Sequence, residues 1–234
     1  MYMDEILLVD KPKGVTSFGV VARVRRELTQ EMREEYERRG ETPPKRLKVG
    51  HAGTLDPFAT GLLIVLVGKA TKRSGEFLKL DKEYVAEIRL GATSTTGDPE
   101  GKITEVVREF DTRYKKPSRE DVETVVKEFL GEITQRVPVY SAVKINGERA
   151  YRLARKGKKV EMPVRKVRIY EIEVLEYEYP RLVLRTKVSS GTYIRALGED
   201  IGKALGTGAY LTELRRTQVG KYTVQDERVM KMVI

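Results

Sequence analysis

Carboxylates, hydroxyls, lysines and arginines supply nearly all the chemistry that this sequence can support. The chain has no cysteine and a single histidine, His51. Disulfides, thiol nucleophiles, iron–sulfur clusters and zinc sites built from histidine and cysteine are therefore excluded. A serine–histidine–aspartate triad would have to include His51. Because a chain without cysteine suits a reducing compartment, we expect a cytoplasmic protein.

The carboxylate best placed for chemistry is Asp56, in the loop GHAGTLDP at residues 50–57. Gly50 and Gly53 let the backbone approach a ligand closely or adopt a positive φ, and Pro57 restricts the backbone of the aspartate before it. A carboxylate held on a stiff loop can act as a nucleophile or a general base. The simpler alternatives are that Asp-Pro marks a turn and that a histidine beside glycine is structural.

The charge of the chain indicates a polyanionic partner. Lysine and arginine number 45 against 35 aspartates and glutamates, which gives a net charge of +10. Such a field favours nucleic acid or an anionic membrane surface. The longest apolar run, residues 62–67, is far shorter than the ~20 residues that span a bilayer, and residues 1–9 do not form a signal peptide. We therefore expect a nucleic-acid partner and no membrane association.

Basic residues are concentrated at residues 149–159, which contain no acid. They are Arg149, Arg152, Arg155, Lys156, Lys158 and Lys159. On a helix, Arg152, Arg155 and Lys156 would share one face suited to following phosphates. A solvated surface is the alternative interpretation.

The elements that must position these residues are hairpin-like groups of strands with helices between them. Apolar runs and alternating patterns predict strands at residues 6–9, 62–67, 84–90, 102–107, 164–176 and 182–188. Ser17 and Ser118 are expected to be the N-caps of two helices, and a third helix is expected to begin beside Tyr193. We interpret residues 49–60 as a loop, residues 84–90 and 102–107 as a hairpin, and Asn146-Gly147 as a tight turn.

Strict βαβ repetition is absent from this order of elements. The predicted fold class is therefore α+β, with a mixed, largely antiparallel central sheet flanked by helices. At ~150 residues per domain, the chain of 234 residues has room for one large domain or two small ones, and one domain is the simpler interpretation. We predict a single domain, residues 1–234.

Six blocks of sequence resemble the TruB-type tRNA pseudouridine synthases. They are LVDKPKGVTS at residues 8–17, GHAGTLDPFATG at 50–61, KEY at 82–84 with LG at 90–91, YSAVK at 140–144, GTYIR at 191–195 and LRR at 214–216. The blocks occur in the family's order and cover most of the chain. The resemblance implies a pseudouridine-synthase-like catalytic domain.

The activity that the resemblance implies is isomerisation of the uridine at position 55 of the tRNA T loop. The glycosidic bond to N1 is broken, the uracil turns, and C5 is joined to the same ribose carbon. Asp56 matches the family's essential aspartate, which either adds to the ring or acts on the ribose. Tyr84 matches a tyrosine that packs on the target base, and Arg195 an arginine that pairs with the catalytic carboxylate.

The resemblance also implies a substrate-binding set. His51 matches a histidine that helps to hold the flipped-out nucleotide, and Leu214 a leucine that lines the pocket. The other predicted RNA-binding residues are Lys11, Thr54, Arg152, Arg155 and Lys156. The expected partner is the tRNA T stem-loop, bound by a monomer that needs no cofactor, no metal and no protein partner.

The chain departs from the family pattern in three places. Residues 29–48 form a longer connection than usual, and residues 136–140 have one proline where relatives commonly have two. The chain ends at Ile234, so we expect no C-terminal RNA-binding domain. The basic residues 149–159, or the connection with residues 45–48, are expected to replace part of its contact with tRNA.

Other functions are compatible with these residues. One is a non-catalytic RNA-binding or RNA-folding protein that keeps the pocket. Another is a guide-RNA-dependent synthase of the dyskerin type, which the presence of a C-terminal domain and protein partners would favour. A carboxylate-dependent hydrolase is disfavoured because no second matching carboxylate accompanies Asp56.

Overall fold

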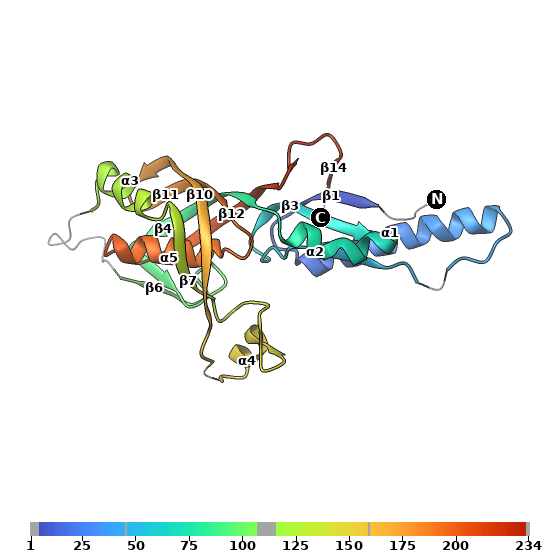
Figure 1. Ribbon diagram of the computed structural model, residues 1–234, viewed down its shortest axis with the longest axis horizontal. Coiled ribbons are helices and arrows are strands. Elements are labelled where there is room, and N and C mark those ends of the chain that lie inside the picture. Colours follow the sequence, from blue (N-terminus) through green and yellow to red (C-terminus); the bar gives the residue numbers. More distant parts are fainter. Residues whose placement is uncertain (1–4, 45, 107–115, 159, 233–234) are drawn as a thin grey trace. The chain divides into compact units, whose positions relative to one another are not determined.

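The computed structural model describes residues 5–44, 46–106, 116–158 and 160–232 (Figure 1). The chain forms two compact units, which we call the first unit, Met1–Glu83 with Arg215–Ile234, and the second unit, Tyr84–Leu214. The single domain predicted from the sequence stays a prediction. None of the helices formed by the described residues combines the length and apolarity that crossing a membrane requires.

The first unit is built on the strand order β14-β1-β3-β12, with β2 beside β3 and β13 beside β12. These strands are β1 Ile6–Lys11, β2 Val49–Ala52, β3 Thr60–Val67, β12 Ala209–Val219, β13 Tyr222–Thr223 and β14 Val229–Lys231. The pairs β1–β14 and β3–β12 are parallel, and β1–β3, β2–β3 and β12–β13 are antiparallel. Only the residues of β12 from Arg215 onward belong to this unit.

The second unit continues the order as β12-β4-β11-β10-β7. Its strands are β4 Lys82–Leu90, β7 Gly131–Arg136, β10 Val164–Glu178 and β11 Arg181–Val188. The pairs β10–β11 and β7–β10 are antiparallel. Because parallel and antiparallel pairs coexist and the antiparallel ones predominate, the predicted α+β class with a mixed, largely antiparallel sheet is confirmed.

Strand β3 is the centre of the first unit's core. Alternate residues Leu63 and Val65 pack on one face with Val20 and Val24 of helix α1, Ser17–Arg38. Residues of the opposite face pack against the 3₁₀ helix η1, Gly68–Arg73, and helix α2, Ser74–Leu78. Burial on both faces explains why residues 62–67 form a continuous apolar run and not an alternating one.

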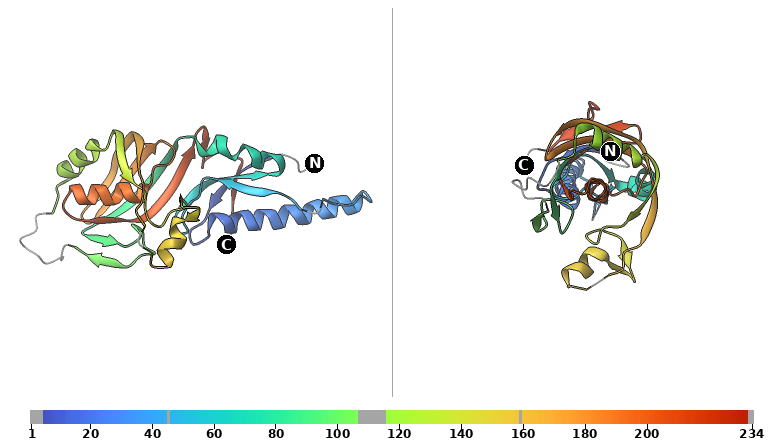
Figure 2. Two further views of the ribbon diagram at one scale, coloured as in Figure 1. Left: turned by 60° about the horizontal axis from the view of Figure 1, so that its bottom comes forward. Right: turned by 90° about the vertical axis from the view of Figure 1, so that its left-hand side faces the viewer.

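In its described residues, the second unit carries three helices and two small hairpins. The helices are α3 Arg119–Glu128, α4 Ala150–Arg155 and α5 Ile194–Ala204, and the hairpins pair β5 Ala92–Ser94 with β6 Ile103–Glu105 and β8 Lys144–Ile145 with β9 Glu148–Arg149. Residues 137–163, between β7 and β10, form what we call the α4 lobe. Figures 1 and 2 show this lobe extending away from α3 and α5.

Several local predictions are confirmed and three are wrong. Ser118 caps α3 in a reciprocal capping box with Asp121, and Asn146 with Gly147 turns the β8–β9 hairpin. The N-cap of α1, however, is Thr16, whose hydroxyl accepts the Gly19 N–H at 2.9 Å, because the Ser17 hydroxyl is used elsewhere.

The other two corrections concern strands. The predicted loop at residues 49–60 contains β2, which pairs with β3 despite its glycine. Within the predicted strand at residues 102–107, the described part forms β6, which pairs with β5 and not with residues 84–90. Residue 107 lies outside the described residues.

Gly61 allows β12 to approach β3 closely. Its φ is +100°, and a Cβ atom there would lie 2.3 Å from the carbonyl oxygen of Arg216. Gly14 also has a positive φ, +82°, but a Cβ atom would meet nothing within 4 Å. A side chain at position 14 would therefore add backbone strain alone, whereas a side chain at position 61 would add strain and a steric clash.

We predict that Gly61→Ala destabilises the protein by roughly twice as much as Gly14→Ala, or more. Both substitutions carry the strain of a left-handed non-glycine residue, on the order of 1–3 kcal/mol, but only Gly61→Ala also displaces a paired strand. Urea unfolding of the two variants measures the difference. Equal free energies of unfolding would show that β12 does not depend on a glycine at this position.

Candidate active site

The loop that carries Asp56 is fixed to helix α1 through one buried serine. The Ser17 hydroxyl donates to the Leu55 carbonyl at 2.9 Å and accepts the Leu55 N–H at 2.8 Å. Both backbone groups of Leu55, which is 4% exposed, are thereby satisfied. Asp56, partly exposed, follows immediately, so its backbone is held from the preceding side.

Lys11 holds the same loop from the following side. Its side chain is fully buried, at 0% exposure, and its ammonium donates to the carbonyls of Val15 at 2.6 Å, Pro12 at 3.0 Å and Pro57 at 3.2 Å. The Gly14 N–H also donates to Pro57, at 2.8 Å. This arrangement favours a positioning role for Lys11 over the direct RNA contact predicted from the sequence, because the ammonium is surrounded by backbone.

Arg216 supports the beginning of the loop. It is 1% exposed, and its guanidinium donates to the carbonyls of Leu62 at 2.7 Å and Gly53 at 3.1 Å. The neighbouring Arg215 forms a two-pronged ion pair with Asp10, at 3.0 and 2.8 Å. Sequence reasoning quoted this arginine pair as part of a motif but gave it no role.

His51 lies on β2 and is half-buried. Burial and the positive charge of Arg216 lower the pKa of its imidazole below the usual 6.5, so the ring is neutral at pH 7. Its Nδ1 atom is buried and has no hydrogen-bond partner among the described residues. Thr54, two residues before Asp56, is exposed.

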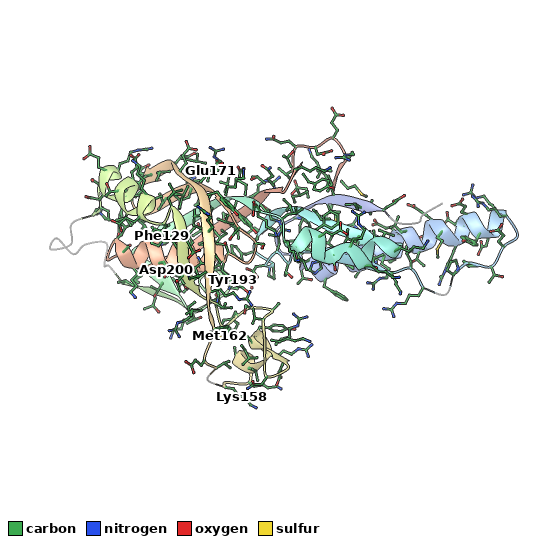
Figure 3. The ribbon with its side chains drawn as sticks, in the orientation of Figure 1. Phe129, Lys158, Met162, Glu171, Tyr193 and Asp200 are labelled. Carbon is green, nitrogen blue, oxygen red and sulfur yellow. The ribbon has the colours of Figure 1, made fainter. Side chains whose placement is uncertain are left out.

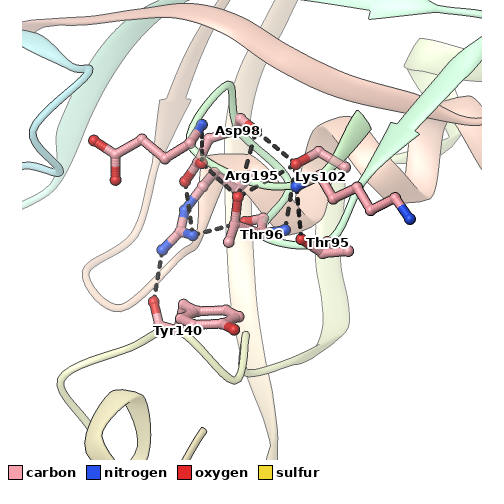
Figure 4. A network of polar contacts seen from close by, with 8 residues as sticks. Thr95, Thr96, Asp98, Lys102, Tyr140 and Arg195 are labelled. Atoms are coloured by element: carbon pink, nitrogen blue, oxygen red, sulfur yellow. Dashed lines mark hydrogen bonds and ion pairs between the residues drawn. The ribbon is translucent and has the colours of Figure 1, made fainter. Parts of the chain in front are cut away.

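Arg195 lies in a closed polar network within the second unit (Figure 4). The guanidinium, 5% exposed, donates to Asp98 at 3.0 Å and to the carbonyls of Thr96 at 2.7 Å and Tyr140 at 2.8 Å. Asp98 also accepts the Glu100 N–H, at 3.0 Å. A buried charge of this kind is tolerated only when its partners are in place. No sequence pattern indicated a role for Asp98, which precedes a proline in a turn-like segment.

Tyr84 and Leu214, the other two predicted pocket residues, are buried and lie on strands of the second unit. Tyr84 begins that unit on β4 and Leu214 ends its last segment on β12. They are 8% and 6% exposed. Asp56 and His51 belong to the first unit and Arg195 to the second, so the pairing of Arg195 with Asp56 stays a prediction.

Lys156 and Arg152, two basic side chains of the α4 lobe, each have a partner within the lobe. Lys156 forms an ion pair with Glu148 at 2.6 Å, a carboxylate one residue before the basic stretch at residues 149–159. The Arg152 guanidinium lies 5.9 Å from the centroid of the Tyr151 ring. The side chain of Arg155 and all of residue 159 lie outside what the structure describes.

A small core keeps the α4 lobe folded. Val137, Ala150 and Met162 are buried together, with Tyr193 packed against them. Figure 3 shows Lys158 at the outer end of the lobe and Met162 nearer to the sheet. The exposed Arg152 therefore lies on a helix that is held in place by this small core.

Two solved structures have the same fold as this chain. A chain of a Cbf5-Nop10-Gar1 complex is 34% identical, with a TM-score of 0.69, covering 97% of this chain and 52% of that chain. A chain of an H/ACA RNP bound to a substrate RNA containing 2′-deoxyuridine is 32% identical, with a TM-score of 0.65, covering 97% of this chain and 50% of that one. This chain thus spans about half the length of these neighbours, and its fold is that of the pseudouridine synthases.

Matches to two family models show which family of pseudouridine synthases the chain belongs to. The model described as TruB family pseudouridylate synthase (N terminal domain) matches residues 41–194, and that of the tRNA pseudouridylate synthase B C-terminal domain matches residues 195–233. The chain belongs to the TruB family of pseudouridylate synthases, as the sequence motifs implied, and is an isomerase. The second match falls on α5 and the strands from β12 to β14.

Curated relatives are similar along nearly the whole chain. The tRNA pseudouridine synthase B of Bacteroides fragilis (strain ATCC 25285) is 49% identical over 218 residues, which cover 92% of this chain and 86% of the relative. That of Parabacteroides distasonis is 46% identical over 220 residues, covering 94% and 87%. That of Aquifex aeolicus is 43% identical over 227 residues, covering 96% and 71%.

We predict that Ser17→Ala lowers both stability and turnover. The substitution leaves the N–H and carbonyl of Leu55 buried and unpaired, at a cost of about 1–3 kcal/mol, and loosens the backbone before Asp56. The free energy of unfolding and the rate of product formation at saturating RNA measure the two effects.

Thr16→Ala is the matched control. It removes the cap of α1, at a cost of about 1 kcal/mol, but no contact to the loop. A Ser17→Ala variant whose turnover falls no further than that of Thr16→Ala would show that turnover does not depend on the contact between Ser17 and the loop of Asp56.

Proposed function

We propose that this isomerase converts the uridine at position 55 of the tRNA T loop into pseudouridine, with Asp56 as the catalytic residue. The relatives named tRNA pseudouridine synthase B support tRNA as the substrate. The observation that carries the assignment of Asp56 is the fixation of its loop by Ser17 on one side and by Lys11 on the other. Such a rigid loop is suited to hold a carboxylate at a reacting atom.

The reaction rearranges bonds without a net change in atoms. The bond between N1 and the ribose carbon C1′ breaks, the bond between C5 and C1′ forms, C5 loses its hydrogen, and N1 gains one. Asp56 acts either by adding to the uracil ring or by acting on the ribose, and both routes place a carboxylate oxygen against the reacting nucleotide. The chemistry is an isomerisation and consumes no second substrate.

The target atoms of a stacked loop are accessible only after the nucleotide is extruded. Extrusion costs a few kcal/mol, and stacking of the base on an aromatic ring such as Tyr84 returns ~1–3 kcal/mol. In this proposal Leu214 lines the pocket, the neutral His51 supports the extruded nucleotide, and Arg195 pairs with the Asp56 carboxylate. Thr54 and Arg152 contact RNA, and Arg155 and Lys156 extend that contact along the α4 lobe.

The enzyme acts, in this proposal, as a cytoplasmic monomer on tRNA alone. The likeness to a chain of a Cbf5-Nop10-Gar1 complex raises the second candidate, a synthase that depends on a guide RNA and protein partners. Incubating the purified chain with an unmodified tRNA transcript, and nothing else, separates the two. Product formed without added RNA or protein supports the stand-alone enzyme.

We predict that Asp56→Asn abolishes turnover, by at least about 10³-fold, while tRNA binding is retained. The amide keeps the shape of the side chain but removes the carboxylate that both chemical routes require. Tritium release from a transcript labelled at C5 of uridine measures turnover, and a transcript with cytidine at position 55 shows whether release comes from that position.

Asp226→Asn is the control for this experiment. Asp226 is paired with Arg228 at 2.6 Å in the first unit and has no role in the proposed site, so turnover should be unchanged. An Asp56→Asn variant that releases tritium at a rate comparable to this control contradicts the assignment. Binding without release by the unsubstituted chain would support a non-catalytic RNA-binding protein.

Arg195→Met should reduce turnover more than it weakens tRNA binding. The substitution removes the proposed partner of Asp56, but it also leaves Asp98 buried and unpaired, which costs about 3–5 kcal/mol of stability. The double variant Arg195→Met with Asp98→Asn removes that second effect. We expect the double variant to regain stability in urea unfolding without regaining turnover.

Two results would argue against this role for Arg195. Recovery of turnover in the double variant would make Arg195 a structural residue only. A loss of tRNA affinity that exceeds the loss of turnover would place its guanidinium on phosphates.

A further inference from the structure

A cavity lies within the first unit, at the connection between α1 and β2 that is longer than usual for the family. Its volume is about 560 Å³, within the range of ~300–1,000 Å³ that is typical of small-molecule sites. Its walls are the C-terminal half of α1, residues 41–44 and 46–48, and the 3₁₀ helix η1. Figure 1 shows the chain leaving α1 and running back beside it toward β2.

Backbone contacts hold the walls in place. The Glu41 N–H donates to the Tyr36 carbonyl at 2.9 Å, where the chain leaves α1, and the Gly68 N–H donates to the Lys48 carbonyl at 2.8 Å. The Thr71 hydroxyl closes η1 on the Gly68 carbonyl at 2.7 Å. Leu47, 8% exposed, is part of the core that α1 shares with β3. The cavity is therefore preformed.

The cavity has an apolar floor and a cationic rim. Met32 and Leu47 are buried beneath it, and the half-buried Tyr36 contributes an aromatic ring. Five cationic side chains and two carboxylates line it. Glu35 is already paired with Arg39.

Three of the cations have no ion-pair partner among the residues that the structure describes. The exposed side chains of Arg46, Lys48 and Lys72 form no ion pair with any carboxylate in the described part of the chain. Cations left unpaired around a preformed cavity favour an anionic ligand. The apolar floor and the ring require that this anion carry a flat, weakly polar group as well.

We propose that this cavity binds one nucleotide, with its phosphate on Arg46, Lys48 and Lys72 and its base on Tyr36. Phosphate accepts hydrogen bonds from arginine and lysine, and unpaired bases stack on tyrosine. The nucleotide can belong to the RNA substrate, outside the T arm, or be free in solution. RNA as the source rests on the proposed function.

Position along α1 favours the RNA source. Ser17, which holds the catalytic loop, and Arg39, at the cavity, lie at opposite ends of a helix of 22 residues, a length of about 33 Å at 1.5 Å per residue. One nucleotide cannot contact both ends. A substrate that occupies the loop and the cavity together must extend well beyond the modified residue.

The test compares the double variant Arg46→Ala with Lys72→Ala, the variant Tyr36→Leu, and a control double variant, Arg33→Ala with Lys79→Ala. The control removes one arginine and one lysine from exposed positions of the same unit outside the cavity. Binding of three probes is measured at several salt concentrations: a full tRNA transcript, an isolated T-arm hairpin and uridine 5′-monophosphate. Thermal melting checks that each variant is folded.

We expect the double variant at the cavity to bind full tRNA at least about 10-fold more weakly, with a log–log salt slope reduced by about one to two. Tyr36→Leu should weaken binding roughly 5- to 100-fold with an unchanged slope. The T-arm hairpin and the control variant should be unaffected. Loss of uridine 5′-monophosphate binding instead would support the cavity with a free nucleotide as its ligand.

Two results would overturn the proposal. One is full tRNA and mononucleotide binding that neither cavity variant changes. The other is a loss that the control variant reproduces, or that Tyr36→Leu does not share, because either would show a general effect of charge and no nucleotide pocket. Pseudouridine formation in the T-arm hairpin is scored separately: its absence contradicts the proposed function, while mononucleotide binding still tests the cavity.

Discussion

The burial of the Lys11 ammonium is the constraint on which the loop of Asp56 depends. An ammonium without water is tolerated only where oxygens replace its hydration shell, and here the carbonyls of Pro12, Val15 and Pro57 do so. These carbonyls come from two segments that are separated along the chain by helix α1 and strand β2. The lysine can be buried only if the turn after β1 and the loop around Asp56 are both in their observed places. A displacement of either segment would leave a charge unsolvated.

The same principle recurs at the other buried cations. Arg216 is satisfied by the carbonyls of Gly53 and Leu62, and Arg195 by Asp98 and two carbonyls. Burial and the nearby Arg216 lower the pKa of Lys82 to about 8, so that this ammonium loses its proton just above neutral pH. A net charge of +10 counts all these groups alike, but contact with phosphates requires exposure. The cations most central to the fold are thus not the ones most able to hold RNA.

The sequence was informative wherever a local pattern had a single physical explanation. The continuous apolar run at residues 62–67 predicted a buried strand, and Ser118 predicted the cap of a helix; both are observed. Thr16 and Ser17 show where local reasoning fails. Either hydroxyl can cap a helix, and the choice between them is made by Leu55, a residue 38 positions away.

The prediction of the site was limited in the same way, because a local pattern does not show contacts between residues that are far apart in the sequence. The motifs predicted Asp56, Tyr84 and Arg195 as site residues, but they did not indicate the residues that hold these side chains or their loops in place. Asp98 contacts Arg195 across 97 positions, and a turn-forming aspartate looks the same in sequence whether it is exposed or buried against an arginine. Only the tertiary structure distinguishes an ion pair that holds a site from a charge on the surface.

Helix α1 connects the two sites of the first unit. Its first turn supplies the Ser17 hydroxyl that fixes the loop of Asp56, and its last turns form one wall of the cavity at Tyr36 and Arg39. A helix is stiff along its axis, so the separation of the loop and the cavity is set by chain length and does not depend on a flexible linker. If the cavity holds a nucleotide of the substrate, α1 acts as a spacer that matches the RNA at two points. The densely charged C-terminal half of α1 would then be required because it sets the distance between the loop of Asp56 and the cavity.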